Sequence, residues 1–435
     1  MTLSSSLNAG VAGLNVNSSK LSTISDNIAN SQTNGYKRVD TQFASLVVGG
    51  GGGRYTAGGV RSLSFREVDG RGGLITTNNA TDISIGGRGL LPVTTISSLD
   101  NLDGDLPIQF LPTGSFRPDE NGVLRTASGK TLLGWPANRD GTIPAFPRDT
   151  IRGLEPVQIN SGSLTNEPTT EITLGVNLPA EQSKSTGSGD PIPLSIEYFD
   201  NVGASQSLSL EFTPTIPATG ASNEWTVTVS DSLTPAASNP IATFTVTFDD
   251  AAATGGAILN VTGATGGAYD ATTGLFSFTT GAGPMDLDIG IPGESNGLTQ
   301  LSAEFGPTGV RKNGTPVGSL TSVVVNEDGL VQGVFGSGAV RTLYQIPIAD
   351  FANLNGLTAV DGQAYVPSPS SGSLFLWDAG DGPTGNVVGF ALEQSTADVA
   401  GELTALITTQ RAYSSNATVI RTVDEMLQET TNLKR

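Results

Sequence analysis

The two ends of this 435-residue chain carry a seven-residue apolar repeat that its middle lacks. Near the start, the residues seven apart are Leu7, Leu14, Leu21 and Ile28. Near the end, they are Leu392, Val399, Leu406, Tyr413, Ile420 and Leu427. A sustained spacing of seven keeps one face of a helix against a neighbouring helix. The repeat therefore predicts a helix at each end, the second over about residues 398–433, with the repeat residues other than Leu392 forming a seam between helices.

The first predicted helix is crowded with residues that form helices poorly. They are Ser4, Ser5, Ser6, Asn8, Gly10, Gly13, Asn15, Asn17, Ser18 and Ser19. An ordinary coiled coil within one chain is the simpler alternative, but a self-sufficient coiled coil would avoid this composition. We therefore expect the ends to be disordered in the monomer and to become ordered when other copies supply partners, which makes them a polymerisation device.

Period-2 alternation rich in Thr, Val and Ile fills the middle of the chain and predicts half-buried strands. It is clearest in WTVTVSD (225–231), IATFTVTF (241–248) and LTSVVVNEDGLVQGVF (320–335). Turn signals interrupt it at DENG (119–122), NRDG (138–141), DNVG (200–203) and NEDG (326–329). We expect a mainly β protein, in which two nested β-rich domains are inserted between N- and C-terminal α-helices that pair as a coiled coil.

The expected division into domains follows from this nesting. Residues 1–33 and 396–435 form a terminal helical domain, 34–70 and 366–395 a connecting segment, 71–155 and 301–365 an inner β domain, and 156–300 an outer β domain inserted in the inner one. The connecting segment contains a glycine run, Gly49 to Gly53. This run is either a hinge or subunit-contact loop or a disordered linker, and the sequence does not decide between them.

Composition argues against an enzyme. The chain has no His and no Cys, so it lacks the commonest general acid–base and any Cys-thiolate, disulfide or Cys/His zinc chemistry. Asp286 and Asp288 are a weak glycosidase candidate, because no second carboxylate pair or aromatic sugar platform accompanies them. The cluster Asp100, Asp103 and Asp105 lacks the spacing of a calcium loop and reads as a solvated turn. We expect no catalytic residue, no metal and no cofactor.

Charge is concentrated in the middle of the chain. The formal net charge is −19, whereas residues 1–40 hold three bases against two acids and residues 398–435 four bases against five acids. Near-neutral ends and an acidic body suit a polymer, with contacts at the ends and repulsion outside. So acidic a surface argues against nucleic-acid binding. We also expect no cleaved signal peptide and no membrane insertion, because the start has no basic region and no run of 18 apolar residues exists.

Two segments resemble the signatures of the flagellar axial proteins, the rod, hook and hook-associated subunits of bacteria. They are SDNIANSQTNGYKR (25–38) and AGELTALITTQRAYSSNATVIRTVDEMLQETTNL (400–433). The positions that match the signatures are Asn27, Ile28, Ala29, Asn30, Gly35, Tyr36, Gln410, Arg411 and Tyr413. Asn27, Asn30 and Asn34 either form hydrogen bonds within the first helix or end it, and Gly35 favours an end just before it.

The middle of the chain resembles the hook branch of this family more than the rod branch. NATDISIGGRGLL (79–91) and residues 114–135 are similar to stretches shared by both branches, whereas residues 344–372 resemble the hook branch. The distal rod protein lacks an insertion like residues 156–300. One departure lies at residues 394–398, where the family usually reads Ser-Asn-Val-Asp after Leu-Glu, so the cap of the last helix is either Asp398 or Thr396.

This resemblance implies a structural subunit that self-assembles into a flexible, curved tube, the hook of the bacterial flagellum, which transmits torque as a universal joint outside the cell. It implies export through the flagellar type III apparatus, assembly under a hook cap, and contacts with the distal rod and the hook–filament junction proteins. The terminal helices would form the inner tube, and the seam residues would hold copies together. The alternatives are a flagellar rod protein and a secreted β-rich adhesin or binding protein.

Overall fold

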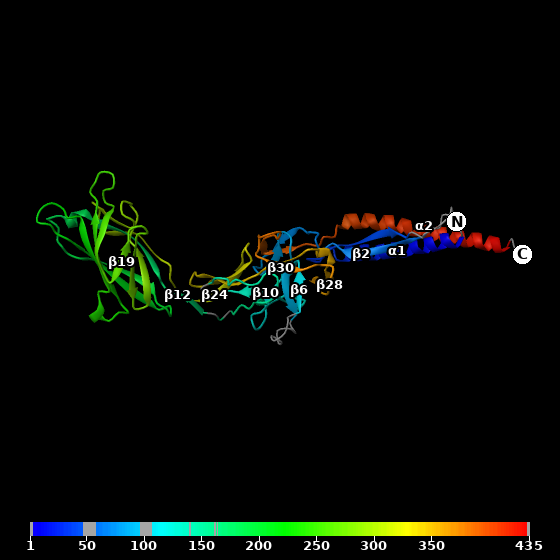
Figure 1. Ribbon diagram of the computed structural model, residues 1–435, viewed down its shortest axis with the longest axis horizontal. Coiled ribbons are helices and arrows are strands. Elements are labelled where there is room, and N and C mark those ends of the chain that lie inside the picture. Colours follow the sequence, from blue (N-terminus) through cyan, green and yellow to red (C-terminus); the bar gives the residue numbers. More distant parts are fainter. Residues whose placement is uncertain are drawn as a thin grey trace. The chain divides into compact units, whose positions relative to one another are not determined.

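The computed structural model describes residues 3–46, 58–95, 107–138, 141–160, 162 and 164–432. The glycine run and the acidic cluster at residues 100–105 lie outside the described residues. The chain divides into two compact units. Unit 1 comprises Met1–Asn160, Ser322–Gly333 and Arg341–Arg435, and unit 2 comprises Ser161–Thr321 and Val334–Val340. Unit 2 is thus nested within the sequence of unit 1, and the chain is mainly β, as predicted (Figure 1). The finer division into four parts stays a prediction.

One long helix lies near each end of the chain. Helix α1 spans Leu3–Ala29 and helix α2 spans Val399–Asn432, close to the 398–433 predicted from the repeat. The two lie side by side in Figure 1, which confirms that they pair. Because Asn27 contacts Glu402 while Gly10 lies against Ile420, the helices run antiparallel. Neither of these two described helices combines the length and the apolarity that crossing a membrane requires.

Unit 1 contains most of the short strands. They are β1 (Val39–Ser45), β2 (Val60–Arg66), β3 (Leu74–Thr76), β4 (Asp82–Ile85), β5 (Leu91–Thr95), β6 (Ile108–Leu111), β7 (Thr113–Ser115), β8 (Arg117–Pro118), β9 (Leu124–Arg125), β10 (Lys130–Pro136), β11 (Glu155–Pro156), β27 (Ile348–Phe351), β28 (Thr358–Val360), β29 (Ala364–Val366), β30 (Leu374–Trp377), β31 (Val387–Gly389) and β32 (Ala391–Glu393). The ribbon β1–β2 pairs over its full length and packs on α1. Strand β3 pairs with β32, which brings the strand before α2 back to the first part of the chain.

Unit 2 is built mainly from two sheets, which include all of its strands except β12. Its strands are β12 (Leu164–Glu167), β13 (Glu171–Pro179), β14 (Ile192–Phe199), β15 (Ser205–Pro214), β16 (Glu224–Asp231), β17 (Ala242–Phe248), β18 (Ile258–Thr265), β19 (Gly267–Asp270), β20 (Leu275–Thr280), β21 (Gly283–Asp288), β22 (Leu298–Leu301) and β23 (Gly306–Lys312). One sheet has the order β14-β15-β16-β17-β18, and the other is arranged around β13. Three further strands, β24 (Thr315–Val325), β25 (Leu330–Phe335) and β26 (Val340–Gln345), contain residues of both units.

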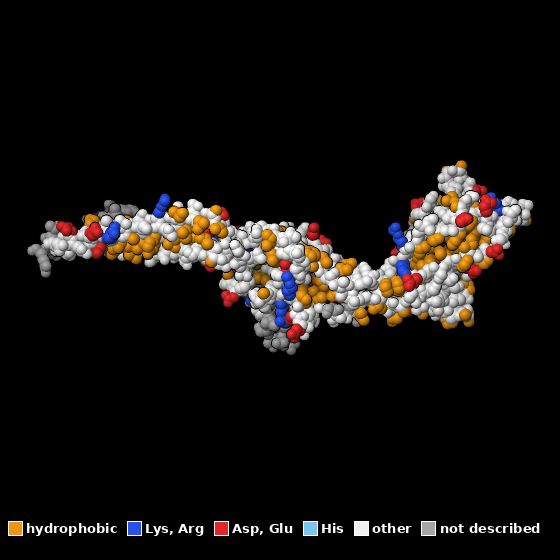
Figure 2. Space-filling view, turned by 180° about the vertical axis from the view of Figure 1, so that it is seen from behind, with side chains coloured by type: hydrophobic (Ala, Val, Ile, Leu, Met, Phe, Trp, Pro, Cys, Tyr) orange, Lys and Arg blue, Asp and Glu red, His pale blue; other side chains and the backbone are white. Residues whose placement is uncertain are grey.

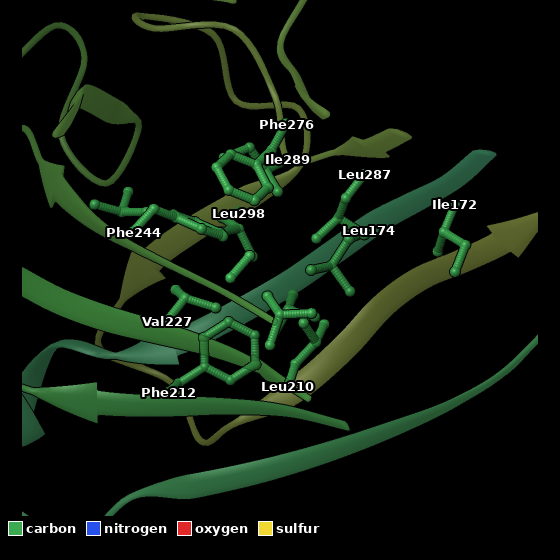
Figure 3. Close-up of a cluster of buried hydrophobic side chains, with 14 of the residues drawn as sticks. Ile172, Leu174, Leu210, Phe212, Val227, Phe244, Phe276, Leu287, Ile289 and Leu298 are labelled. Carbon is green, nitrogen blue, oxygen red and sulfur yellow. The ribbon is translucent and has the colours of Figure 1, made fainter. Parts of the chain in front are cut away.

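The predicted alternation is confirmed in β16 and β17. Burial alternates residue by residue along both strands, with Trp225, Val227 and Val229 buried on β16 and Phe244 and Val246 buried on β17. Their threonines lie on the opposite face. The buried side chains of the two sheets meet in one core, where residues such as Phe212, Phe244, Phe276 and Leu298 converge (Figure 3). This core gives unit 2 its own source of stability.

The predicted turns form where their glycines allow a left-handed backbone. Gly122, Gly203 and Gly329 have φ angles of 79°, 79° and 74°. Each donates its N–H to the carbonyl three residues earlier, on Asp119, Asp200 and Asn326. A residue with a Cβ atom would be strained in this conformation, which is why glycine ends each turn. The turn at NRDG includes two residues outside the described ranges.

The core of unit 2 predicts the effect of one truncation. Phe244 is 1% exposed, and its ring lies 4.4 Å from that of Phe276. Phe244→Ala should lower the free energy of unfolding of unit 2 by about 3–5 kcal/mol. Thr245→Ala on the opposite face should change it by less than about 0.5 kcal/mol. Native-state hydrogen exchange at the amides of β16 and β17 measures both values, and equal effects would contradict this assignment of the core.

Candidate assembly site on the terminal helices

Helices α1 and α2 approach each other closely where α1 has no side chain. A Cβ atom on Gly13 would lie 2.8 Å from Asn416 Nδ2, and one on Gly10 would lie 3.0 Å from Ile420 Cγ1. Both distances are shorter than ordinary contacts between non-bonded atoms, so a side chain at either position would displace that of Asn416 or Ile420. The glycines that weaken α1 as an isolated helix therefore permit its close packing on α2.

The buried residues of α2 complete the predicted seam. They are Glu402, Thr409 and Val423, and the half-buried Asn416, which lies against Gly13, completes their spacing of seven. The predicted row of Leu406, Tyr413, Ile420 and Leu427 alternates with this row along α2. The combined spacing alternates between four and three, as the a and d positions of a coiled coil do. Sequence reasoning found only the apolar half of this pattern, because the other half is mostly polar.

The predicted seam residues are only partly covered within one chain. The half-buried ones are Leu7, Leu14, Leu21, Ile28, Leu406 and Ile420. The exposed ones are Val399, Tyr413 and Leu427, at 40, 40 and 39%. The buried face of α1 is formed instead by Val16, Asn17, Ile24 and Asn27. The contact between α1 and α2 thus uses small and polar residues and leaves much of the apolar surface uncovered.

Further apolar residues lie on both sides of the seam of α2, and we call them its apolar flanks. On one flank, Val399, Leu403 and Ile407 lie four apart, and the last two are 47 and 50% exposed. On the other, Val419 and Met426 lie seven apart and are 45 and 58% exposed. Figure 2 shows hydrophobic side chains gathered along these helices. Exposed apolar residues that line up in this way are typical of surfaces that contact a protein, a membrane or a ligand.

Asn27 connects the two helices to the first β-ribbon. Its side-chain Nδ2 donates to Glu402 Oε1 at 3.0 Å and to the Val39 carbonyl at 2.9 Å. Its Oδ1 accepts the Val39 N–H at 2.9 Å. Asn27 is 1% exposed, so these bonds replace water that the amide has lost. The asparagine therefore fixes α1, α2 and β1 relative to one another within unit 1.

Tyr36 and Gly35 form the turn that follows α1. The Tyr36 hydroxyl lies 2.9 Å from Asp26 Oδ2 and 3.0 Å from Asn27 Oδ1. Burial and the hydrogen bond to Asp26 raise the pKa of Tyr36 to about 12, so the hydroxyl remains a donor. Gly35 has a φ of 74° and donates its N–H to the Glu393 carbonyl. The helix ends at Ala29, ahead of this glycine.

A buried ion pair lies next to this turn. Lys37 Nζ lies 2.7 Å from Glu393 Oε1, and the two side chains are 3 and 5% exposed. Lys37 also donates to the Gly70 carbonyl, and Glu393 accepts the Gly72 N–H. Burial lowers the pKa of the Lys37 ammonium, and the Glu393 carboxylate opposes that shift. The pair joins the segment after α1 to the strand before α2, and each partner requires the other.

The start of α2 is held by three polar contacts. Arg38 Nε lies 2.6 Å from Glu402 Oε1, and the Arg38 N–H donates to the Thr396 hydroxyl at 2.8 Å. Asp398 accepts the N–H groups of Ala400 and Gly401 at 3.0 and 3.2 Å. Asp398 is therefore the N-cap of α2. Thr396, the other candidate from the sequence, binds Arg38 instead.

The structure brings together only part of the family signature. Asn27, Gly35 and Tyr36 meet at this junction, and Asn30 donates to Asp26 beside it. Ile28 is half-buried and Ala29 is exposed. The C-terminal signature residues Gln410, Arg411 and Tyr413 lie exposed along α2. Sequence reasoning did not identify Lys37, Glu393 or Glu402 as site residues. Two signals were visible: Lys37 lies within the segment that resembles the N-terminal signature, and Glu402 is the acidic residue in the first turn of α2.

The two candidate catalytic residues from the sequence, Asp286 and Asp288, have ordinary structural roles. Asp286 and Asp288 lie on the outer face of β21, where Asp286 accepts the Ser277 hydroxyl and Asp288 the Gly290 N–H. Within the described ranges, no group of three or more acidic residues is placed to hold a metal ion.

Three family models match the chain. Residues 7–37 match a flagella basal body rod protein, residues 193–315 the flagellar basal body protein FlaE D2 domain, and residues 389–433 the flagellar basal body rod FlgEFG protein C-terminal region. The first and last matches cover the paired helices and their junction. The matches place the chain in the class of flagellar rod and hook proteins. The matched regions lie at both ends of the chain and on an insertion between the ends.

Curated relatives identify the branch of this class. The flagellar hook protein FlgE of Brucella suis biovar 1 is 32% identical over 440 residues and covers the whole of both chains. That of Salmonella typhimurium is 29% identical and covers 99% of this chain and all of its own. The chain belongs to the flagellar hook protein family and is a structural subunit of the bacterial flagellar hook.

A solved structure, the Helicobacter pylori flagellar hook protein FlgE2, is similar with a TM-score of 0.45 and 14% identity, over 72% of this chain and 98% of that one.

If charge pairing stabilises the buried ion pair, replacing both of its residues should cost less stability than replacing Lys37 alone. Lys37→Met should lower the free energy of unfolding of unit 1 by about 3–5 kcal/mol, because it leaves the Glu393 carboxylate buried without its partner. Adding Glu393→Gln removes that charge and keeps an acceptor for the Gly72 N–H, so it should restore most of the loss. Hydrogen exchange at the amides of β3 and β32 measures this. A double variant as unstable as Lys37→Met would show that charge pairing is not the reason.

Proposed function

We propose that this hook subunit polymerises through the paired helices α1 and α2, with the apolar flanks and seam of one copy packing on the helices of its neighbours. One observation carries the proposal: much of the contact within a chain is made by glycines and polar residues, with few buried apolar side chains, while Leu403, Ile407 and Met426 stay exposed. A surface of this kind loses its contact with water when copies assemble, and that burial drives association. The helices would then form the inner tube of the hook.

We further propose that the hook acts as a flexible universal joint that transmits torque from the rod to the filament. A curved rotating tube compresses one side and stretches the other in every turn, so its subunits must shift relative to one another. Unit 2 supports this role because its outward sheet face is rich in hydroxyls, such as those of Thr228, Thr243 and Thr245. Small polar side chains exchange partners with water readily, so contacts through them slide at low cost.

We also propose a route of export and a set of protein partners for the chain. The chain leaves the cell through the flagellar type III apparatus without loss of a signal peptide, and it assembles beneath a hook cap. It contacts the distal rod at one end of the hook and the junction proteins at the other. It has no enzymatic activity. The similarity of residues 7–37 to rod proteins supports a shared export and assembly route. The match of residues 193–315 to the D2 domain favours the hook over the rod alternative.

A charge on the apolar flank should prevent assembly without unfolding the chain. Leu403 is 47% exposed in the single chain, so Leu403→Asp leaves unit 1 intact. Burying that side chain in the polymer contributes about 1.5–3 kcal/mol, so the variant should raise the critical concentration for assembly about 10- to 100-fold. Tyr413→Asp on the seam should act in the same direction. Sedimentation and negative-stain microscopy measure the polymer, and circular dichroism checks the fold.

Thr422→Asp supplies the matched control. It places the same charge on an exposed polar position of the same helix, so it should polymerise nearly as well as the natural chain. Equal loss in both variants would attribute the effect to net charge and contradict the proposed surface.

Deletion of residues 1–30 separates the hook from the adhesin alternative. The deletion removes α1 and with it the partner of α2, so polymers should no longer form. A binding protein whose terminal helices are incidental would keep its surface binding after the same deletion. Polymers of normal appearance from the shortened chain would contradict the proposal.

A further inference from the structure

Unit 2 contains a groove between two strand edges. Strand β14 is the first strand of the five-stranded sheet, and β23 lies at the edge of the other sheet, beside β13. A groove of about 520 Å³ separates them, lined by residues 194–197 and 307–312. Among the strands that the structure describes, none pairs with the outer edge of either one. The groove therefore lies between two rows of backbone groups that have no strand as partner.

The register of β14 shows which of its residues point into the groove. The Asp200 N–H bonds to the Ala204 carbonyl, which continues the ladder between β14 and β15. Hydrogen bonding alternates along an antiparallel pair, so Ile196 and Leu194 bond to β15 while Glu197 and Ser195 face away from it. The Glu197 carbonyl confirms this, because it accepts Lys312 Nζ from across the groove at 3.1 Å. Pro193 has the same orientation, and it has no N–H to leave unpaired.

The same reasoning applies to β23. The Asn313 N–H bonds to the Glu171 carbonyl, so Arg311 continues the ladder to β13. The backbone groups of Val310 and Lys312 then face the groove. Burial agrees, because β23 is exposed from Pro307 to Arg311 although it belongs to a sandwich sheet. Val310 is 38% exposed beside the core residue Ile196.

The width of the groove suits a single additional strand. The Lys312 side chain crosses from one edge to the other and reaches Glu197 Oε2 at 2.7 Å as well as the Glu197 carbonyl. The edges are therefore too far apart to bond directly, yet close enough for one side chain to bridge. Lys312 and Glu197 close this end of the groove, and the part next to Ser195 and Val310 stays open. An extended peptide placed there could bond to both edges.

Charge indicates what kind of peptide would enter. Within residues 161–321 the only basic residues are Lys184, Arg311 and Lys312, so two of the three lie in β23 at the groove. Lys184 pairs with Glu181 and Lys312 with Glu197. Arg311 forms no ion pair with a described residue. Its cation faces a chain whose net charge is −19, so a second copy offers complementary acidic segments.

We infer that this groove accepts an extended segment from a second copy of the chain, which adds a strand between β14 and β23. The inference rests on the proposed polymerisation and adds to it a contact made by unit 2. Backbone hydrogen bonds would supply the binding, and Arg311 would favour a segment with an acidic side chain. The contact would resist separation of neighbouring copies, complementing the helix contacts of unit 1.

Hydrogen exchange in the full chain tests the inference directly. The amides of Ser195 and Val310 should exchange freely in the monomer and at least about 100-fold more slowly in the polymer. Equal exchange in both states would overturn the inference. Slow exchange already in the monomer would also overturn it, because the chain's own residues would then fill the groove. Failure of the natural chain to polymerise would refute the proposed function itself, and the groove inference with it.

A pair of variants checks the backbone contact. Val310→Pro removes an N–H that faces the groove and leaves the bonds between β23 and β13, so it should raise the critical concentration about tenfold. Val310→Thr keeps the N–H and serves as the control, with a change of less than twofold. Hydrogen exchange of the monomer verifies that β13 remains protected in both. Equal assembly of the two variants, with β13 protected, would contradict strand addition.

Discussion

The close antiparallel contact between α1 and α2 is the interaction on which the rest of the structure depends. Gly10 and Gly13 allow the helix backbones to approach, and Asn17 and Asn416 occupy positions where a conventional coiled coil has apolar residues. The contact therefore buries little apolar surface. The leucine and isoleucine rows remain partly uncovered, and in the proposed polymer neighbouring copies would bury them. A helix pair of this composition should be only weakly stable in a single chain and should associate readily with other copies.

A compact polar network joins that helix pair to the β part of unit 1. Asn27 and Glu402 connect the helices to each other and to β1, and the Lys37–Glu393 pair connects the segments that enter and leave them. Because these groups are buried, loss of one partner is costly, which favours a single geometry over a hinge that bends freely. We infer that the base of the helices is rigid and that flexibility of the assembly arises elsewhere.

Sequence reasoning succeeded where a pattern is local and repeated. The spacing of seven located α2 to within a residue at each end and placed a helix at the start of the chain, although α1 ends at Ala29 and not just before Gly35; alternation located β16 and β17. It failed where a contact joins distant residues of ordinary type. Nothing in the sequence pairs Asn27 with Glu402, 375 residues away, or shows that polar Thr409 lies in the seam. The groove between β14 and β23 was equally invisible, because it depends on which strand edges remain unpaired after folding.

The central claim is that the apolar flank of α2 is open in the single chain and covered in the polymer. Since the natural chain has no cysteine, Leu403→Cys introduces a unique thiol on that flank. The rate of its reaction with a water-soluble maleimide, measured in monomer and in assembled polymer, is the most direct test. The account predicts rapid labelling of the monomer and labelling at least about 100-fold slower in the polymer. Equal rates in the two states would contradict it.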